Sequence, residues 1–163
     1  MLRPVEQTKL EAEGSPDRLT SPPPGPNYTL EERIGAHRVW LFPPDLVELQ
    51  IRGDLSAPEM ARLGSIFRRL SGELPWMLLS VDITHLGDLP ASTRRTAAHQ
   101  GHLALFAGCV MWGGSFMQRV LATMVWNAVR LLGQSHPMPP VTVVSTQAEA
   151  HAFLDTQRAR RQA

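Results

Sequence analysis

Hydrophobic and polar residues alternate with the period of a β-strand near the start of the predicted domain. Two apolar-rich runs, at 36–42 and 46–51, are separated by a Pro-Pro-Asp segment that is typical of a tight turn. In the second run the polar positions Glu48 and Gln50 alternate with apolar ones, which indicates that one face is more buried than the other. The two runs are predicted to pair as an antiparallel hairpin.

Helical periodicity follows, and capping residues mark where the helices begin. Ser56 and Glu59 have the spacing of a capping box, so a helix is predicted to begin there and to end at Gly72. Thr146 and Glu149 repeat this arrangement before a terminal helix. The last turns of this helix contain Arg158, Arg160 and Arg161. Their positive charges are predicted to stabilise the helix, because its carboxyl end is the negative end of the dipole.

A strongly apolar run at 76–83 is predicted to be a buried strand inside the sheet. A loop with Gly87 and Pro90 follows, and then a helix is predicted over 91–106 whose small side chains give it little apolar surface to bury. In sheets flanked by helices, functional groups gather at the carboxyl ends of the strands. We therefore expect a functional edge at 82–95.

The last third of the chain contains a helix that is more apolar than a surface helix needs to be. Short strands are predicted at 109–112 and 141–144, and Ser115 is predicted to cap the helix over 116–132. Apolar residues cover more of this helix than the single stripe that packs on a core. The side chains expected to line either an apolar ligand pocket or a dimer interface are Phe116, Met117, Met124 and Trp126.

The chain divides into a tail and one domain. Residues 1–28 combine charges with Ser-Pro, Pro-Pro-Pro and Gly-Pro steps, and apolar residues are too sparse to offset the entropy of ordering them. A disordered, Pro-rich tail at 1–28 and a single domain at 29–163 are therefore predicted.

Composition narrows the classes of function. The 163 residues carry 16 basic and 15 acidic side chains, so the net charge of +1 gives no field that would attract nucleic acid. The single cysteine, Cys109, excludes an intrachain disulfide, and the N-terminus lacks a secretory signal, so a cytoplasmic location is predicted. The uncharged run at 101–118 is shorter than the roughly 20 apolar residues of a membrane-spanning helix, and no transmembrane segment is expected.

Residue types that support catalysis or metal binding are not arranged in a recognisable site. His99 and His102 could share one face of a helix, but no third ligand follows at a suitable spacing. The sequence contains no nucleophile elbow, no identifiable Cys-His pair and no phosphate-binding loop. We therefore expect no metal, no cofactor and no enzymatic activity.

The predicted order of elements is β-β-α-β-α-β-α-β-α, which indicates an α/β fold with a mixed sheet of about five strands. This order, together with the segments Leu46–Gly53, Leu78–Ile83 and Thr146–Leu154, resembles the STAS domain. The resemblance is closest to the SpoIIAA-like group, which is also compared with Sec14-type lipid-binding domains, and it covers about residues 36–158.

The resemblance implies a site at the start of the helix after the central strand. In anti-sigma factor antagonists of this family a kinase phosphorylates a serine there, and counting from Asp82 places that serine at Ser92, in Pro-Ala-Ser-Thr rather than the usual Asp-Ser-Ser-Gly. The alternative, favoured by the frequency of such caps, is that Ser92 or Asp88 is an ordinary N-cap. The residues expected to bind a partner are Asp88, Ser92, Thr93, Arg94 and Arg95.

Two of these residues, Arg94 and Arg95, place positive charge in the first turn of the predicted helix. Positive charge in the first turn of a helix opposes the dipole by roughly 0.3–1 kcal/mol unless an anion lies nearby. Asp82 or Asp88 could supply that anion to Arg94 and Arg95. Otherwise an acidic partner surface or a phosphate headgroup would supply it.

These observations favour a non-catalytic regulatory or adaptor domain that acts through protein–protein contact, with a regulatory kinase or another signalling protein as the partner. Two alternatives remain open. One is binding of a lipid or another apolar small molecule between the apolar helix and the sheet. The other is a homodimerisation module that uses the same helix.

Overall fold

The computed structural model describes residues 27–132 and 138–163, so nearly all of the predicted tail at 1–28 lies outside the described residues. The described chain forms a six-stranded mixed sheet with α-helices on both faces, which confirms the predicted α/β class and the order of its helices. The strands are β1 (Leu30–Ile34), β2 (His37–Phe42), β3 (Leu46–Gly53), β4 (Leu78–Leu86), β5 (Gly108–Trp112) and β6 (Val141–Val144). The helices are α1 (Ala57–Glu73), α2 (Ala91–Gln100), the short 3₁₀ helix η1 (His102–Leu105), α3 (Phe116–Leu132) and α4 (Gln147–Gln162).

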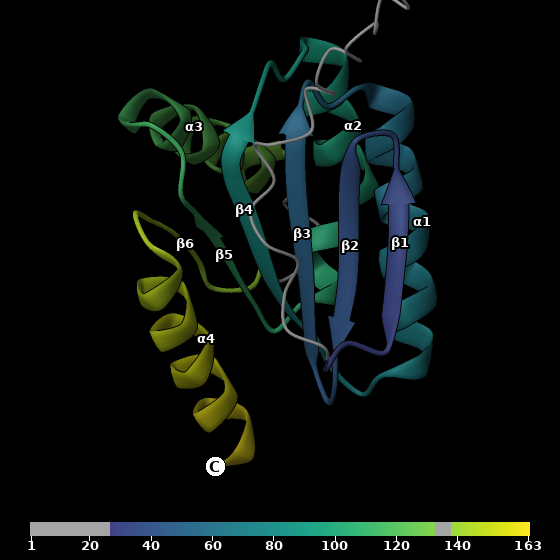
Figure 1. Cartoon of the computed structure of the whole chain (residues 1–163), viewed down its shortest axis with the longest axis vertical. Coiled ribbons are helices and arrows are strands. Elements are labelled where there is room, and N and C mark those ends of the chain that lie inside the picture. Colours follow the sequence, from purple (N-terminus) through teal and green to yellow (C-terminus); the bar gives the residue numbers. More distant parts are fainter. Residues whose placement is uncertain (1–26, 133–137) are drawn as a thin grey trace, which may run out of the picture.

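The strands lie in the sheet in the order in which they occur in the sequence (Figure 1). β2 is antiparallel to both of its neighbours, β1 and β3, and the pairing of Phe42 with Leu46 closes the predicted hairpin between β2 and β3. From β3 to β6 the strands are parallel. β4 therefore lies inside the sheet, as predicted for the apolar run at 76–83.

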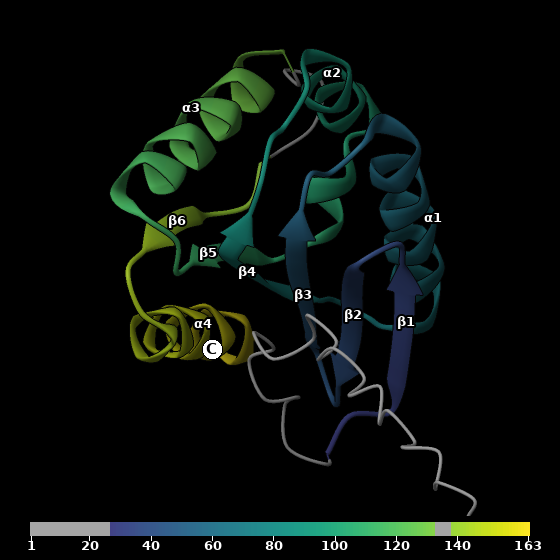
Figure 2. The same ribbon diagram turned by 45° about the horizontal axis from the view of Figure 1, so that its top comes forward.

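The connections decide which face each helix covers. Crossovers between parallel strands are right-handed, and here all of them step in the same direction across the sheet. The helices that make these crossovers, α1, α2 and α3, therefore lie on one face (Figure 2). α4 follows the last strand and packs on the opposite face, against β5 and β6.

Most of the core lies between the sheet and the three crossover helices. Alternate residues of the two central strands point into it, namely Val47, Leu49 and Ile51 of β3 and Leu79, Val81 and Ile83 of β4. A smaller cluster beneath α4 contains Leu78, Val110, Ala150 and Leu154. The alternation predicted for β3 is thus the alternation between the two faces of the sheet.

The caps predicted for α1, α3 and α4 are present. The Ser56 hydroxyl accepts from the amide of Glu59 while the Glu59 carboxylate accepts from the amide of Ser56. Thr146 and Glu149 make the same reciprocal pair at the start of α4. At α3, the Ser115 hydroxyl accepts a hydrogen bond from the backbone amide of Gln118 at 3.3 Å.

The sheet has one strand more than the predicted five. The first predicted strand began at residue 36, but residues 30–34 form the edge strand β1. An edge strand pairs through its backbone on one side and often carries charges that prevent further pairing. Glu31, Glu32 and Arg33 fit that role, and Glu32 forms an ion pair with Arg69 of α1.

Two further boundaries differ from the prediction. β4 ends at Leu86 rather than Ile83 because its pairing with β3 continues past an irregularity, to the pair of Gly53 with Leu86. The helix predicted over 91–106 ends at Gln100, where Gly101 adopts a left-handed conformation with φ of 61°. η1 then follows as a separate turn.

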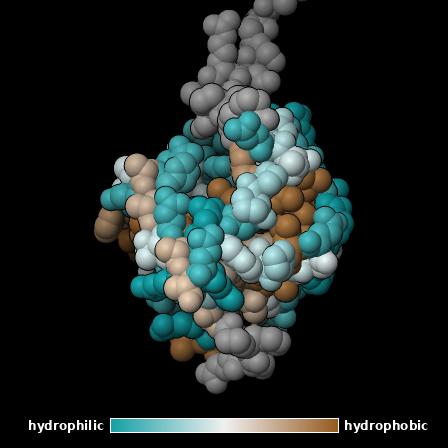
Figure 3. Space-filling view, turned by 90° about the horizontal axis from the view of Figure 1, so that it is seen from below, coloured by the Kyte–Doolittle hydropathy of each residue, from teal (hydrophilic) through white to brown (hydrophobic). Residues whose placement is uncertain are grey.

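Hydrophilic residues cover much of the end at which the parallel strands begin, and hydrophobic side chains show between them (Figure 3). No helix within 27–132 or 138–163 is long and apolar enough to cross a membrane. Apolar surface is nevertheless concentrated on α3. The large hydrophobic side chains that are exposed in the described chain are Phe116, Met117, Met124 and Leu131.

Candidate functional site

The predicted functional edge is a rigid junction between two loops. The amide of Gly87 donates to the carbonyl of Gly53 at 2.8 Å, and the amide of Asp88 donates to the Asp54 carboxylate at 2.7 Å. The Thr93 hydroxyl donates to the carbonyl of Leu55, also at 2.7 Å. These bonds fasten the start of α2 to the loop after β3.

The residues predicted to bind a partner therefore separate into two groups. Asp88, Ser92, Arg94 and Arg95 are exposed at this edge. Thr93 is fully buried, and its hydroxyl is used in the bond to Leu55. The prediction of Thr93 as a partner-binding residue is wrong, because this side chain fastens α2 to the rest of the domain.

The N-cap prediction for α2 is also wrong. The capping residue is Pro90, and no side chain makes a capping hydrogen bond. The Asp88 carboxylate accepts from the amide of Leu89, just before the helix, and Ser92 lies within the first turn. The Ser92 hydroxyl is therefore not used as a cap.

The anion expected beside the two arginines is not provided by the described residues. The Asp82 carboxylate accepts from the Gln50 amide group at 3.2 Å and from the Thr84 backbone at 2.9 Å. Arg94 donates to the carbonyl of Leu89 at 2.7 Å. Within the described chain neither Arg94 nor Arg95 forms an ion pair, so both charges are available to an external anion.

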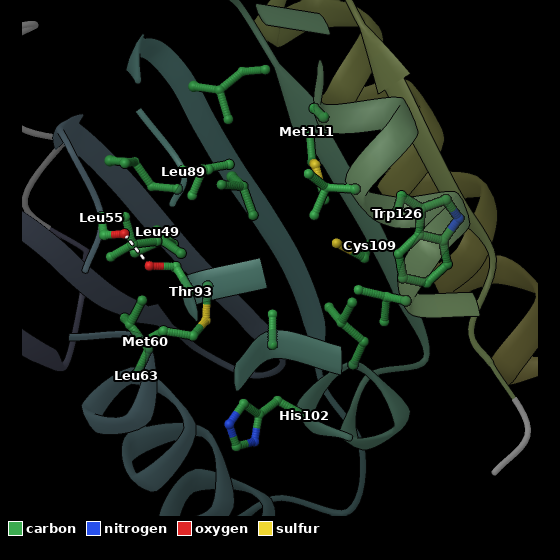
Figure 4. A pocket seen from close by; sticks show the side chains of 18 of the residues that line it. Leu49, Leu55, Met60, Leu63, Leu89, Thr93, His102, Cys109, Met111 and Trp126 are labelled. Carbon is green, nitrogen blue, oxygen red and sulfur yellow. Dashed lines mark hydrogen bonds between the residues drawn. The ribbon is translucent and has the colours of Figure 1, made fainter. Parts of the chain in front are cut away.

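A pocket of about 120 Å³ lies behind this edge, between the sheet and the helices α1, α2 and α3 (Figure 4). Of the 22 described residues that line it, only Thr93, Arg94 and His102 are polar or charged. The sheet contributes Leu49, Ile51, Leu79, Val81, Ile83, Leu86, Cys109 and Met111, and the helices and loops contribute Leu55, Met60, Leu63, Phe67, Leu89, Ala97, Leu103, Ala122, Val125, Trp126 and Val129.

Small side chains on two helices explain why the space is not filled. Ala97 of α2 and Ala122 of α3 both line the pocket, where larger residues would reach the sheet. Native cores are close-packed, so a hollow of this size is a departure from the usual density. The strand order also has no reversal within its parallel part, and it therefore lacks the crevice at which such sheets usually bind ligands. The space for a ligand lies beneath the helices instead.

His102 forms part of the pocket wall on the α1 side (Figure 4). Its Nε2 atom is hydrogen-bonded to the Gln100 side chain, whereas Nδ1 is buried without a partner in the described structure. Burial, together with the positive charge of Arg68, lowers the pKa of His102 to about 4, so the ring is neutral near pH 7. The ring fits against α1 because residue 64 is glycine, and a Cβ atom at Gly64 would lie 1.7 Å from Nε2.

Cys109 lines the opposite wall, near Trp126 (Figure 4). Burial raises the pKa of its thiol to about 12. The thiolate is the reactive form of cysteine, and almost none of it is present at neutral pH. Cys109 is thus an inert part of an apolar wall.

Of the four residues predicted to line a pocket or a dimer interface, only Trp126 lines the pocket. Phe116, Met117 and Met124 point away from the core, and 64–70% of their surface is exposed. α3 therefore has one apolar side toward the pocket, which includes Trp126, and another toward the outside, which carries the other three residues.

Most residues that form the pocket could not be identified from the sequence. Two signals pointed to it: the excess of apolar residues in α3, among them Trp126, and the small side chains in the helix after β4, which predicted weak packing there. His102 was considered with His99 on one helix, but Gly101 ends α2 between them, and His102 belongs to η1. The pair therefore does not share a helix face.

No family model matches the chain, and no curated protein is similar enough to count as a relative.

Proposed function

We propose that the domain binds a small apolar molecule in the pocket beneath α2 and α3. The observation that carries this proposal is a hollow of about 120 Å³ whose lining is apolar except at three residues. Binding pockets are typically lined by hydrophobic side chains with a few polar groups that orient the ligand. Arg94 is exposed and also lines the pocket, so it can contact solvent and a bound molecule.

The volume limits the ligand. An engineered cavity of about 150 Å³ in another protein holds one benzene ring, so this pocket suits one ring or a short alkyl chain. A carboxylate or another acidic group on that chain would be attracted to Arg94, which has no carboxylate partner in the described residues. The ligand class that fits best is a small amphiphile with an acidic head.

A series of alkyl carboxylates of increasing length, titrated by calorimetry, tests this proposal. Each buried CH₂ group contributes about 0.8 kcal/mol, so affinity should rise about fourfold per carbon until the pocket is full. Ala97→Leu should abolish binding by filling the space beside α2. Arg94→Gln should remove the preference for a carboxylate over the alcohol of equal length.

The matched control is Ala159→Leu, which adds the same side chain on the exposed surface of α4. Its affinities should equal those of the unmodified protein. If affinity does not depend on chain length, or if Ala97→Leu binds as well as Ala159→Leu, the pocket is not a binding site.

As a second candidate, we propose a protein-docking role for the edge that carries Ser92, Arg94 and Arg95. It is supported by the exposure of these residues on a junction fixed by hydrogen bonds, and by the absence of carboxylate partners for either arginine in the described chain. If the resemblance to STAS domains holds, it implies that a regulatory kinase contacts this edge and that Ser92 accepts the phosphate.

Affinity purification with quantitative mass spectrometry tests this second role. The double substitution Arg94→Glu and Arg95→Glu should lower the recovered amount of each specific partner at least tenfold, because it reverses the charge of the surface. The control is Arg160→Glu with Arg161→Glu, the same charge change on exposed residues of α4. Retention of every partner by the first variant would exclude this edge as the docking surface.

A further inference from the structure

We propose that the outer side of α3 binds the surface of an anionic lipid bilayer. The large hydrophobic side chains that are exposed in the described chain, Phe116, Met117, Met124 and Leu131, all belong to this one helix. Single exposed hydrophobic residues are normal, but a group of them on one element marks an interaction surface. The inference does not depend on whether the pocket is occupied.

The helix has two apolar sides with different environments. Ala122 and Val129 are buried, and both line the pocket. Met117, Met124 and Leu131 are spaced by seven residues, which places them along one line on the opposite side of the helix. The helix is ~25 Å long at 1.5 Å per residue, so this line can lie flat in a membrane interface.

The charge around α3 fits an anionic surface. The chain contains no Asp or Glu between Leu89 and Ala148, whereas this stretch contains four arginines, Arg94, Arg95, Arg119 and Arg130. The same stretch includes α2 and α3, which lie side by side on one face of the sheet (Figure 2). The near-zero net charge of the chain therefore conceals two neighbouring helices, α2 and α3, that carry basic but no acidic side chains. An interfacial helix needs exposed apolar side chains together with nearby positive charge, and α3 has both.

A second copy of the chain fits this surface less well. Pairing α3 with its copy would bring together two helices that carry arginines but no Asp or Glu, so the arginines of the two copies would repel each other. One helix of this length also offers only a few hundred Å² of contact, below the roughly 800 Å² per partner of a stable interface. In an anionic bilayer the lipid phosphates pair with the arginines, and the acyl chains cover the apolar side chains.

Co-sedimentation with vesicles tests the inference. We expect binding to vesicles of phosphatidylcholine mixed with phosphatidylglycerol, little binding to pure phosphatidylcholine, and weaker binding as salt is raised. Met124→Asp with Leu131→Asp should reduce binding at least tenfold. Both side chains are exposed, so a thermal melt should show that these substitutions leave the fold intact.

The matched control is Thr156→Asp with Ala159→Asp, which adds the same two charges to exposed positions of α4 on the other face of the sheet. It should bind vesicles as the unmodified protein does. Three results would overturn the inference: no binding to the mixed vesicles, equal binding to the neutral ones, or sedimentation showing a dimer that Met124→Asp with Leu131→Asp converts to monomers.

Discussion

Glu48→Gln should stabilise the protein by about 3 kcal/mol at about pH 8 and leave its stability below about pH 4 nearly unchanged. Glu48 lies on β3, on the face opposite the main core, between Trp40 of β2 and Ser80 of β4. Burial, together with the negative charge of the nearby Asp82 carboxylate, raises the pKa of its carboxyl from 4.5 to about 7. No hydrogen bond to this carboxyl is present in the described structure.

The direction of the effect follows from proton binding. Below about pH 4.5 the Glu48 carboxyl is protonated in both the folded and the unfolded chain. Between 4.5 and about 7 only the unfolded chain releases the proton, so the free energy of unfolding falls as pH rises. Each pKa unit corresponds to about 1.4 kcal/mol, which gives a loss of about 3 kcal/mol that is complete above about pH 7. Glutamine resembles the protonated acid and cannot ionise.

Urea unfolding at a series of pH values measures this effect. The difference between Glu48→Gln and the unmodified protein should grow between about pH 5 and 8 and then stay constant. Glu73→Gln removes an exposed carboxylate from α1 and is the control, with an expected change within about 0.5 kcal/mol at every pH. A gain that does not vary with pH would show that Glu48 does not ionise in this range.

Local sequence signals predicted most of the fold. The reciprocal pairs of Ser56 with Glu59 and of Thr146 with Glu149 depend only on residues three apart, and they place the starts of α1 and α4. The apolar run in β4 predicted a strand inside the sheet because only a strand covered on both faces can be apolar at nearly every position. The strand β1 was missed because an edge strand is held by backbone pairing, which its charged side chains do not reveal.

The candidate site was harder to predict because it depends on which way side chains face. The spacing in α3 showed two apolar sides but could not show that Trp126 lines a pocket while Met124 is exposed. Thr93 was predicted to be accessible because its position in the first turn of α2 is visible in the sequence. Its contact with Leu55 is not visible, since the two residues are far apart in the chain. Tertiary contacts therefore decided the site.

Tertiary contacts that the sequence does not reveal also occur at the end of α4. The sequence predicted only that the charge of Arg158 favours the helix dipole. In the structure the Arg158 guanidinium donates to both carboxylate oxygens of Asp45, at 2.7 and 2.8 Å, and also to Asp155. Asp45 lies in the turn between β2 and β3 and is 3% exposed. The pair fastens α4 to the first half of the sheet, which α4 does not otherwise cover.

Arg158→Met should therefore destabilise the protein by about 3 kcal/mol, because it leaves the Asp45 carboxylate buried without its partner. That is the low end of the range for buried pairs, since the Arg158 side chain is 29% exposed. Adding Asp45→Asn should recover part of the loss by removing the unpaired charge, and a double-mutant cycle measures the coupling between the two residues. Arg160→Met, on an exposed position of the same helix, should change the free energy of unfolding by less than about 0.5 kcal/mol. Equal effects of Arg158→Met and Arg160→Met would mean that the pair with Asp45 does not hold α4 in place.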